Sequence, residues 1–141
     1  ANGYRSFSKS QIKSLVVLAK ILLKKYKIRG KNILGHSDIA PLRKKDPGEK
    51  FPWKYLFKKK IGIWHNLNPK KLKLIRGKMT GFNFNKFIKY LNKIGYNTKF
   101  SNHYELKKII KIFQMKFRPE LIDGKLDLEC YEIAKSLSIC N

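Results

Sequence analysis

The first part of the chain carries a helical pattern of apolar positions. Ser8 and Gln11 have the spacing of a capping box, in which the two side chains satisfy backbone N–H groups at a helix start. Apolar residues then recur at helical spacing, at Ile12, Leu15, Val16, Leu18, Ala19, Leu22 and Leu23. This pattern predicts a helix from about Lys9 to Tyr26 with one wide apolar face, ending before Gly30.

A short apolar pair, Ile33-Leu34, follows this helix and predicts a short buried strand over residues 32–35. The polar stretch 37–51 comes next and is expected to be a long loop. Three residues that disfavour helix interrupt it: Pro41, Pro47 and Gly48. Long loops inside compact domains are usually functional, so this loop is the first place to look for chemistry.

The remaining pattern predicts four more helices and one interruption. Pro52 suits the first position of a helix that covers Trp53 to about Lys60. Between Gly62 and Gly81 the apolar periodicity breaks at several Asn, Pro and Gly residues, which is typical of a linker. Apolar residues at helical spacing then predict three helices, over Asn83–Ile94, Asn102–Phe117 and Asp127–Leu137.

These elements predict a mostly α-helical chain in two parts. Residues 1–62 form a unit of helix, strand and loop, residues 63–81 a linker, and residues 82–141 a small three-helix bundle. A chain of 141 residues with 43% hydrophobic residues is long enough for one ordinary domain or two small ones. No apolar run approaches the roughly 20 residues that cross a bilayer, so we expect no transmembrane segment.

The charge balance is strongly basic, with 33 Lys and Arg against 9 Asp and Glu and a net charge of +24. One interpretation is an anionic partner such as nucleic acid, an acidic polymer or a membrane surface. The other is coding bias, because Lys, Ile and Asn are all abundant and the lysines are spread along the whole chain. Since no nucleic-acid motif accompanies the charge, specific nucleic-acid binding is the last-ranked hypothesis.

The two cysteines, Cys130 and Cys140, do not form a disulfide framework or a C-x-x-C motif. They lie ten residues apart near the end of the chain, so a bridge between them is open. Buried free thiols are the favoured interpretation.

The candidate chemistry lies in the long loop. His36 and Asp46 stand ten residues apart across it, and an imidazole with a carboxylate suits a zinc ion. A catalytic zinc usually takes three protein ligands, so the set is incomplete, and surface residues are the alternative. Lys44 is a candidate for stabilising the oxyanion of an attacked carbonyl, or else a solvated charge.

The other candidate residues receive structural interpretations. Asp38 either holds the loop through backbone N–H groups or orients His36. His65 and His103 have no partner at ligand spacing, so both are predicted not to bind metal. Asp123-Gly124 indicates a turn and Asp127 a helix cap.

The loop resembles part of a known family. The elements G-H-S-D-I-A-P at 35–41, K-x-D-P-G at 44–48 and F-P-W at 51–53 look like zinc-dependent N-acetylmuramoyl-L-alanine amidases of type 2, which are related to peptidoglycan recognition proteins. The resemblance implies that His36 and Asp46 are two of three zinc ligands. It also implies that Lys44 polarises the carbonyl of the bond to be cut.

The end of the chain is similar to small three-helix peptidoglycan-binding domains. The segment Phe113–Pro119 reads F-Q-M-K-F-R-P, and Asp123-Gly124 and Asp127 follow it, as in that module. Together the two resemblances cover roughly residues 8–137. They imply an envelope or periplasmic location, with a cytoplasmic one as the alternative.

The chain departs from the family pattern in what precedes the loop. In that family a first zinc histidine and an acidic general base come before the opening helix, whereas here no histidine precedes His36 and no acidic residue precedes Asp38. The resemblance therefore implies the C-terminal portion of a mixed-sheet α/β domain, completed by an N-terminal segment as a separate chain. The expected function is zinc-dependent hydrolysis of the N-acetylmuramoyl-L-alanine bond in peptidoglycan or muropeptides; the alternative is a non-catalytic peptidoglycan-binding fragment.

Overall fold

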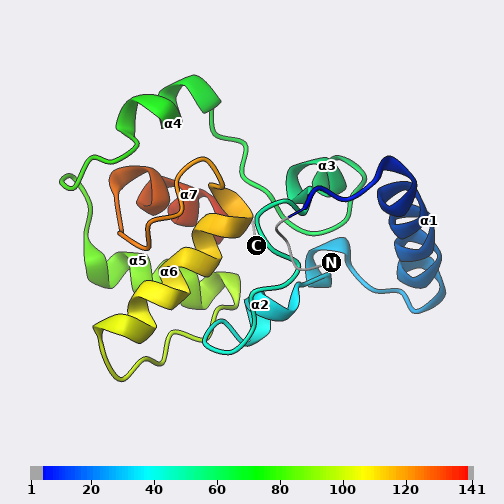
Figure 1. The fold of residues 1–141 in the computed structure, drawn as a ribbon, viewed down its shortest axis with the longest axis horizontal. Coiled ribbons are helices and arrows are strands. Elements are labelled where there is room, and N and C mark those ends of the chain that lie inside the picture. The colour runs from blue at the N-terminus through cyan, green and yellow to red at the C-terminus, as the bar shows by residue number, and fades with distance from the viewer. Residues whose placement is uncertain (1–4, 140–141) are drawn as a thin grey trace.

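The computed structural model describes residues 5–139, and within this range every regular element is a helix. Figure 1 shows them in chain order as α1 (Lys9–Lys25), the 3-10 turn η1 (Gly30–Asn32), α2 (His36–Ile39), α3 (Trp53–Lys58), α4 (Pro69–Ile75), α5 (Phe84–Ile94), α6 (His103–Phe117) and α7 (Leu128–Ile139). The helices predicted for the two ends of the chain are therefore confirmed, with small differences at their limits.

The predicted strand, and with it the mixed α/β sheet, is wrong for the described residues. Residues 30–32 form η1, and the Ile33 N–H bonds back to the Gly30 carbonyl at 3.1 Å inside that turn. The same carbonyl accepts a bond from Gly62 at 2.8 Å. The Gly30 carbonyl thus accepts one hydrogen bond within the turn and one from Gly62. Residues 5–139 contain no neighbouring strand with which residues 32–35 could form a ladder.

The opening of α1 follows the predicted capping box. The Ser8 N–H donates to Gln11 Oε1 at 2.9 Å, and the Gln11 N–H donates to Ser8 Oγ at 3.1 Å. The apolar side chains of this helix are only partly buried, because Ala19 is buried while Leu18 on the predicted face, and Val17 and Ile21 outside it, are each more than half exposed. A large apolar surface on α1 therefore faces outward.

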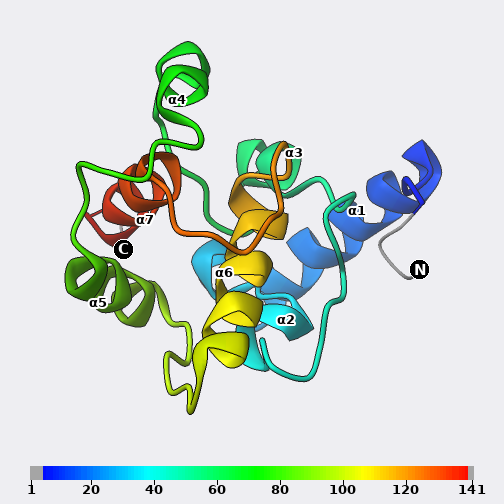
Figure 2. The same cartoon turned by 60° about the vertical axis from the view of Figure 1, so that its left-hand side comes forward.

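Two hydrophobic cores organise the molecule. The first joins α1 to α3 and the residues around it through four buried side chains: Ala19, Trp53, Leu56 and Ile61. The second lies among α5, α6 and α7, and Leu72 of α4 belongs to it, so part of the predicted linker packs against the bundle. Figures 1 and 2 show α1 and α3 at one side of the molecule and α4 to α7 at the other.

The F-Q-M-K-F-R-P segment closes the bundle through buried polar groups. Gln114 donates to Asp123 Oδ1 at 3.0 Å and accepts from the Gly124 N–H at 2.8 Å. Arg118 donates to Asp127 Oδ2 at 3.0 Å, and Asp127 Oδ1 accepts from the Cys130 N–H at 2.8 Å. The predicted turn and the predicted cap of α7 are both confirmed.

Cys130 is a buried free thiol, as predicted. Burial raises the pKa of this thiol to about 12, so it is protonated at neutral pH. Cys140 lies outside the described residues.

Candidate metal centre

His36 and Asp46 meet directly, although ten residues of chain separate them. His36 is the first residue of α2, and its Nδ1 lies 2.7 Å from Asp46 Oδ2. The backbone closes the loop beside them, because the Ser37 N–H donates to the Asp46 carbonyl at 3.0 Å. The side chains are 70% and 46% exposed, so both remain accessible to a ligand or to another protein segment.

The electrostatics of this pair keep the carboxylate ionised. Some desolvation pushes the pKa of Asp46 upward, but the hydrogen bond with His36, a backbone hydrogen bond and the nearby charges of His36 and Lys44 hold it below its usual value. An ionised carboxylate beside an imidazole is the form that binds a divalent cation.

Lys44 lies close to the pair but does not contact it directly. Its charge contributes to the lowered pKa of Asp46, and its own N–H bonds to the Ala40 carbonyl at 2.9 Å. The side chain is exposed and lines a pocket of about 510 Å³ next to α6, whereas His36 and Asp46 line another of about 310 Å³ beside α1. Lys44 thus lies at the edge of the site, with an exposed side chain.

A network of buried side chains stabilises the start of α2. Asp38 Oδ2 accepts from the Gly35 N–H at 2.8 Å, which confirms the predicted role of Asp38 in holding the loop. The same oxygen lies 2.5 Å from Lys116 Nζ, and Asp38 Oδ1 accepts from the Tyr96 hydroxyl at 2.9 Å. Asp38, two residues after His36, is therefore held by Lys116 of α6 and by Tyr96, which lies two residues after the end of α5.

Burial shifts the pKa values of Lys116 and Tyr96, the two partners of Asp38, in opposite directions. Burial lowers the pKa of Lys116, while the charge of Asp38 and its hydrogen bond oppose that shift. Burial and then the charge of Asp38 raise the pKa of Tyr96 well above its ordinary value, so the phenol stays protonated and keeps donating.

Trp53, from the F-P-W element, packs on the other side of the network. It is 4% exposed, and the Lys116 ammonium lies 4.0 Å from the centroid of its ring. Gly35 passes so close that an added Cβ would lie 2.7 Å from Pro47 Cδ and 3.3 Å from the Trp53 ring. Only glycine fits at this position without movement of the loop that carries Asp46.

Sequence reasoning did not find Lys116 or Tyr96. One signal was available, because Lys116 follows Ile109 and Phe113 on the helical period that forms the buried face of α6. A lysine on a buried helical face requires a buried anion, but the pattern does not say which one.

The donor set fits a zinc ion in chemistry and falls short in number. Imidazole nitrogen with carboxylate oxygen is a normal zinc pair. Within residues 5–139, however, no group of three or more His, Cys, Asp or Glu side chains is arranged to hold a metal ion. Residues 5–139 thus contribute two ligands at most to such a site.

The sequence of the chain is similar to known amidases. Residues 1–49 match the family model described as N-acetylmuramoyl-L-alanine amidase. The chain is 36% identical over 136 residues to N-acetylmuramoyl-L-alanine amidase AmiD of Escherichia coli K12, and this match covers 95% of this chain and 49% of AmiD. The predicted resemblance is confirmed: the chain is related to the type 2 N-acetylmuramoyl-L-alanine amidases.

Other relatives agree. A 47-residue stretch, 33% of this chain and 25% of the relative, is 45% identical to the 1,6-anhydro-N-acetylmuramyl-L-alanine amidase AmpD of Enterobacter cloacae. A structure of E. coli AmiD with anhydro-N-acetylmuramic acid-L-Ala-D-γ-Glu-L-Lys superposes with a TM-score of 0.80 at 35% identity, over 94% of this chain and 52% of AmiD. AmpDh3 of Pseudomonas aeruginosa superposes with a TM-score of 0.82 at 33% identity, over 96% of this chain and 55% of AmpDh3.

The chain spans about half the length of AmiD, a curated relative whose match covers most of this chain. In the part of the chain that the structure describes, no helix combines the length and the apolar character of a membrane span.

Proposed function

We propose that this chain forms part of a zinc-dependent N-acetylmuramoyl-L-alanine amidase, which hydrolyses the amide between the muramoyl lactyl group and L-alanine in peptidoglycan or muropeptides. The observation that carries the proposal is the 2.7 Å approach of His36 Nδ1 to Asp46 Oδ2. Both residues lie in the segment that matches the amidase family, and the similar proteins AmiD and AmpD are named as amidases.

Three residues of this chain have roles in the proposal. His36 and Asp46 hold the zinc ion, and Asp46 is suited to this because its pKa is lowered and it is ionised. A zinc ion bound there would supply Lewis-acid catalysis, which polarises the carbonyl group of the bond to be cut. Lys44, which lies beside this pair and lines the neighbouring pocket, would turn towards the site and donate to the carbonyl oxygen as negative charge develops on it.

The third ligand and the proton-transferring carboxylate come, in this proposal, from a polypeptide segment outside these 141 residues. Two observations support an additional segment. The described residues offer no third ligand near His36 and Asp46. The face of α1 that carries Val17, Leu18 and Ile21 is more than half exposed, and the 310 Å³ pocket beside the pair is lined by apolar residues of the same helix. A segment that packs on the side of α1 that carries Leu15 and Ala19 would reach the pair.

The C-terminal part has a retaining role in this proposal. Residues 82–141 act as a peptidoglycan-binding domain, connected through residues 63–81 to the amidase portion, and hold the polymer near the zinc site. Binding through a second module raises the effective concentration of the bond to be cut. A protein of this kind works in the bacterial cell envelope, with the cytoplasm as the alternative location.

The test uses the natural assembly purified with any accompanying segment. The expected results are one zinc per site and release of the peptide from an N-acetylmuramoyl-peptide, followed by mass spectrometry. Lys44→Ala should keep the zinc and lose about 10²–10³-fold in kcat, the scale of removing one oxyanion donor. Lys45→Ala, an exposed lysine in the same loop, is the matched control and should change little.

The alternative is a peptidoglycan-binding fragment without catalysis. It predicts retention of the polymer with neither stoichiometric zinc nor peptide release. Peptide release that survives His36→Ala together with Asp46→Asn would contradict the proposed zinc site.

A further inference from the structure

The side chain of Lys116 crosses from the second hydrophobic core to the loop that carries the metal candidates. Lys116 lies on α6, and its side chain is only 5% exposed. Figure 2 shows α6 beside α2, the short helix that begins at His36, and the two helices are in contact. The proposed amide hydrolysis gives Lys116 no role. A lysine is rarely buried without a partner, so its position in the fold needs a reason.

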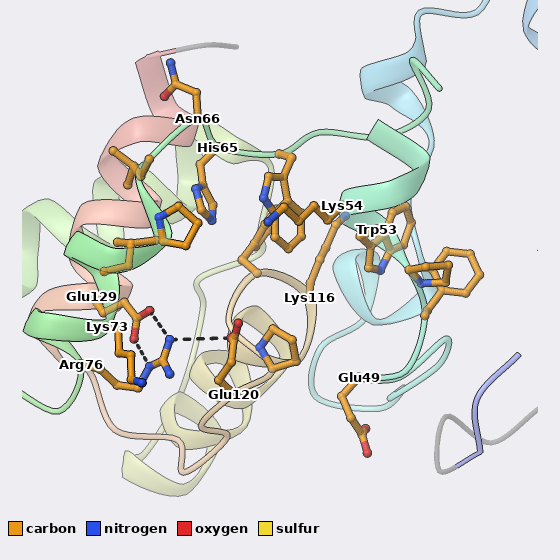
Figure 3. A pocket seen from close by; sticks show the side chains of 18 of the residues that line it. Glu49, Trp53, Lys54, His65, Asn66, Lys73, Arg76, Lys116, Glu120 and Glu129 are labelled. Atoms are coloured by element: carbon orange, nitrogen blue, oxygen red, sulfur yellow. Dashed lines mark hydrogen bonds and ion pairs between the residues drawn. The ribbon is translucent and has the colours of Figure 1, made fainter. Parts of the chain in front are cut away.

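The ammonium group of Lys116 lies between a carboxylate and an aromatic ring. Its Nζ is 2.5 Å from Asp38 Oδ2 and 4.0 Å from the centroid of the Trp53 ring. Figure 3 shows Lys116 and Trp53 at the same wall of a pocket of about 860 Å³, which both residues line. One partner belongs to α2 and the other to α3, so the cation joins α6 to both helices.

Asp38 passes this restraint on to the backbone that precedes His36. The oxygen that Lys116 contacts, Oδ2, also accepts from the Gly35 N–H at 2.8 Å, and Oδ1 accepts from the Tyr96 hydroxyl at 2.9 Å. Gly35 is the residue directly before His36. Three bonds to one buried carboxylate therefore fix the turn from which the His36 side chain starts.

The other metal candidate is attached to the same turn. The Ser37 N–H donates to the Asp46 carbonyl at 3.0 Å, and Ser37 is 9% exposed. Between the two candidates, Leu42 packs against the second hydrophobic core. The loop from His36 to Asp46 therefore contacts the C-terminal helices at two places, at Asp38 and at Leu42.

The two candidate ligands have little support from contacts of their own. The side chains of His36 and Asp46 are 70% and 46% exposed. A metal site needs its ligands held in place by the groups around them. Removing a group that orients a ligand without touching the metal typically lowers metal affinity by roughly 10- to 100-fold. The buried groups behind this loop are in the position to have such an effect.

We propose that Lys116 is a positioning residue of the metal centre, which acts through Asp38 and, together with Tyr96, keeps His36 beside Asp46. The C-terminal helices then form part of the support of the metal ligands, in addition to the retaining role proposed for them above. The binding of zinc rests on the proposed function. The restraint on the loop rests on the contacts of Lys116 alone, and can be measured without metal.

The first test measures amide hydrogen exchange of Ser37 by NMR on the 15N-labelled natural assembly without metal. Lys116→Met should speed this exchange by at least about tenfold, the effect of losing one hydrogen bond to a charged group. Tyr96→Phe is a milder change at the same carboxylate, and should act in the same direction. It decides the question if Lys116→Met does not fold.

The control for this test is Ile133→Ala, which opens a cavity in the second core. Ile133 is fully buried in α7, which packs on α4 and α5. The cavity should destabilise the fold to a degree similar to the loss of Lys116. Because it leaves the contacts of Asp38 intact, it should not change the exchange of Ser37. A purely structural role of Lys116 would make the two variants alike.

The second test measures the zinc affinity of the natural assembly by competition with a chelator. Lys116→Met should weaken zinc binding by roughly 10- to 100-fold, the scale for a group that orients a metal ligand. Tyr96→Phe should weaken it in the same direction, and Ile133→Ala should leave it unchanged.

The proposal is wrong if the Ser37 amide is unprotected in the wild type, or if neither Lys116→Met nor Tyr96→Phe speeds its exchange more than Ile133→Ala does. Wild-type zinc affinity in a folded Lys116→Met variant would also overturn it. Failure of the proposed function looks different. The wild-type assembly would then bind no zinc, while the exchange of Ser37 would still respond to Lys116→Met and not to Ile133→Ala.

Discussion

Lys116 Nζ and Asp38 Oδ2 lie 2.5 Å apart, although 78 positions separate the two residues in the sequence. Their side chains are only 5% and 7% exposed. The pair joins α6 of the second core to α2, whose first residue is His36. The C-terminal helices are thus part of the support of the candidate metal centre, and the two parts of the chain depend on each other.

Removing one member of this ion pair should be costly. The Lys116→Met variant leaves the Asp38 carboxylate buried without its cation, and should lose about 3–5 kcal/mol of unfolding free energy. Urea denaturation followed by circular dichroism measures the loss. The Lys111→Met variant, an exposed lysine on the same helix, is the control and should lie within about 0.5 kcal/mol of the wild type.

The coupling between these two residues has its own test. The double variant with Lys116→Met and Asp38→Asn removes both charges, so it should be less destabilised than the sum of the two single variants. A double-mutant cycle in urea gives the interaction free energy. Strictly additive single effects would show that the two side chains do not interact in solution.

Tyr96 holds the other oxygen of Asp38. The Tyr96→Phe variant removes a hydroxyl that donates to a buried carboxylate at 2.9 Å, and should lose about 1.5–3 kcal/mol, the range for hydrogen bonds to charged groups. The Tyr104→Phe variant makes the same change at a side chain that is 66% exposed. Equal thermal stability of the two variants would contradict a buried hydroxyl–carboxylate bond.

The burial of His65 predicts a pH dependence of stability. Its pKa is about 4 in the folded chain and near 6.5 when unfolded, so between these values the unfolded chain binds the extra proton. Stability should therefore be fully present above pH 6.5 and fall as the pH drops towards 4, by at most about 3 kcal/mol from this residue. Urea midpoints of the wild type and the His65→Phe variant across this range measure it; parallel curves would contradict a buried neutral histidine.

The close approach at Gly35 predicts a local effect on the metal ligands. In the Gly35→Ala variant the new Cβ would lie 2.7 Å from Pro47 Cδ, so the loop next to Asp46 must move. Overpacking of this kind costs about 1–3 kcal/mol, and zinc affinity should fall with it. Isothermal titration of the zinc-free assembly measures the affinity, with Lys45→Ala as the loop control. Unchanged zinc affinity in a destabilised Gly35→Ala variant would contradict this prediction, because it would show that movement of the loop leaves the metal ligands in place.

Local sequence signals predicted α1, α3, α5, α6 and α7, but not α2 and α4, which lie in the predicted loop and in the predicted linker. The Ser8 and Gln11 box, the Asp127 cap and the periodic apolar positions each act within a few residues, so they can be read without knowing the rest of the fold. The spacing of His36 and Asp46, together with the family resemblance, indicated a common site, and the structure brings the two side chains together.

Features that depend on distant partners could not be predicted. Ile33 and Leu34 have the composition of a strand, but a strand requires a neighbour, and here η1 takes up the local backbone bond. Lys116 is one lysine among many in a very basic sequence, and only the tertiary fold distinguishes it by placing Asp38 beside it. His65 is marked in the same way, by its place in a pocket wall rather than by its neighbours in the chain.

The most direct test of the central claim is zinc K-edge X-ray absorption on the metal-loaded natural assembly, combined with zinc content per site. The account predicts one zinc with imidazole nitrogen and carboxylate oxygen in its first coordination sphere, and loss of that zinc in the variant with both His36→Ala and Asp46→Asn. A double variant that retains stoichiometric zinc with an unchanged spectrum would contradict the assignment of His36 and Asp46 as ligands.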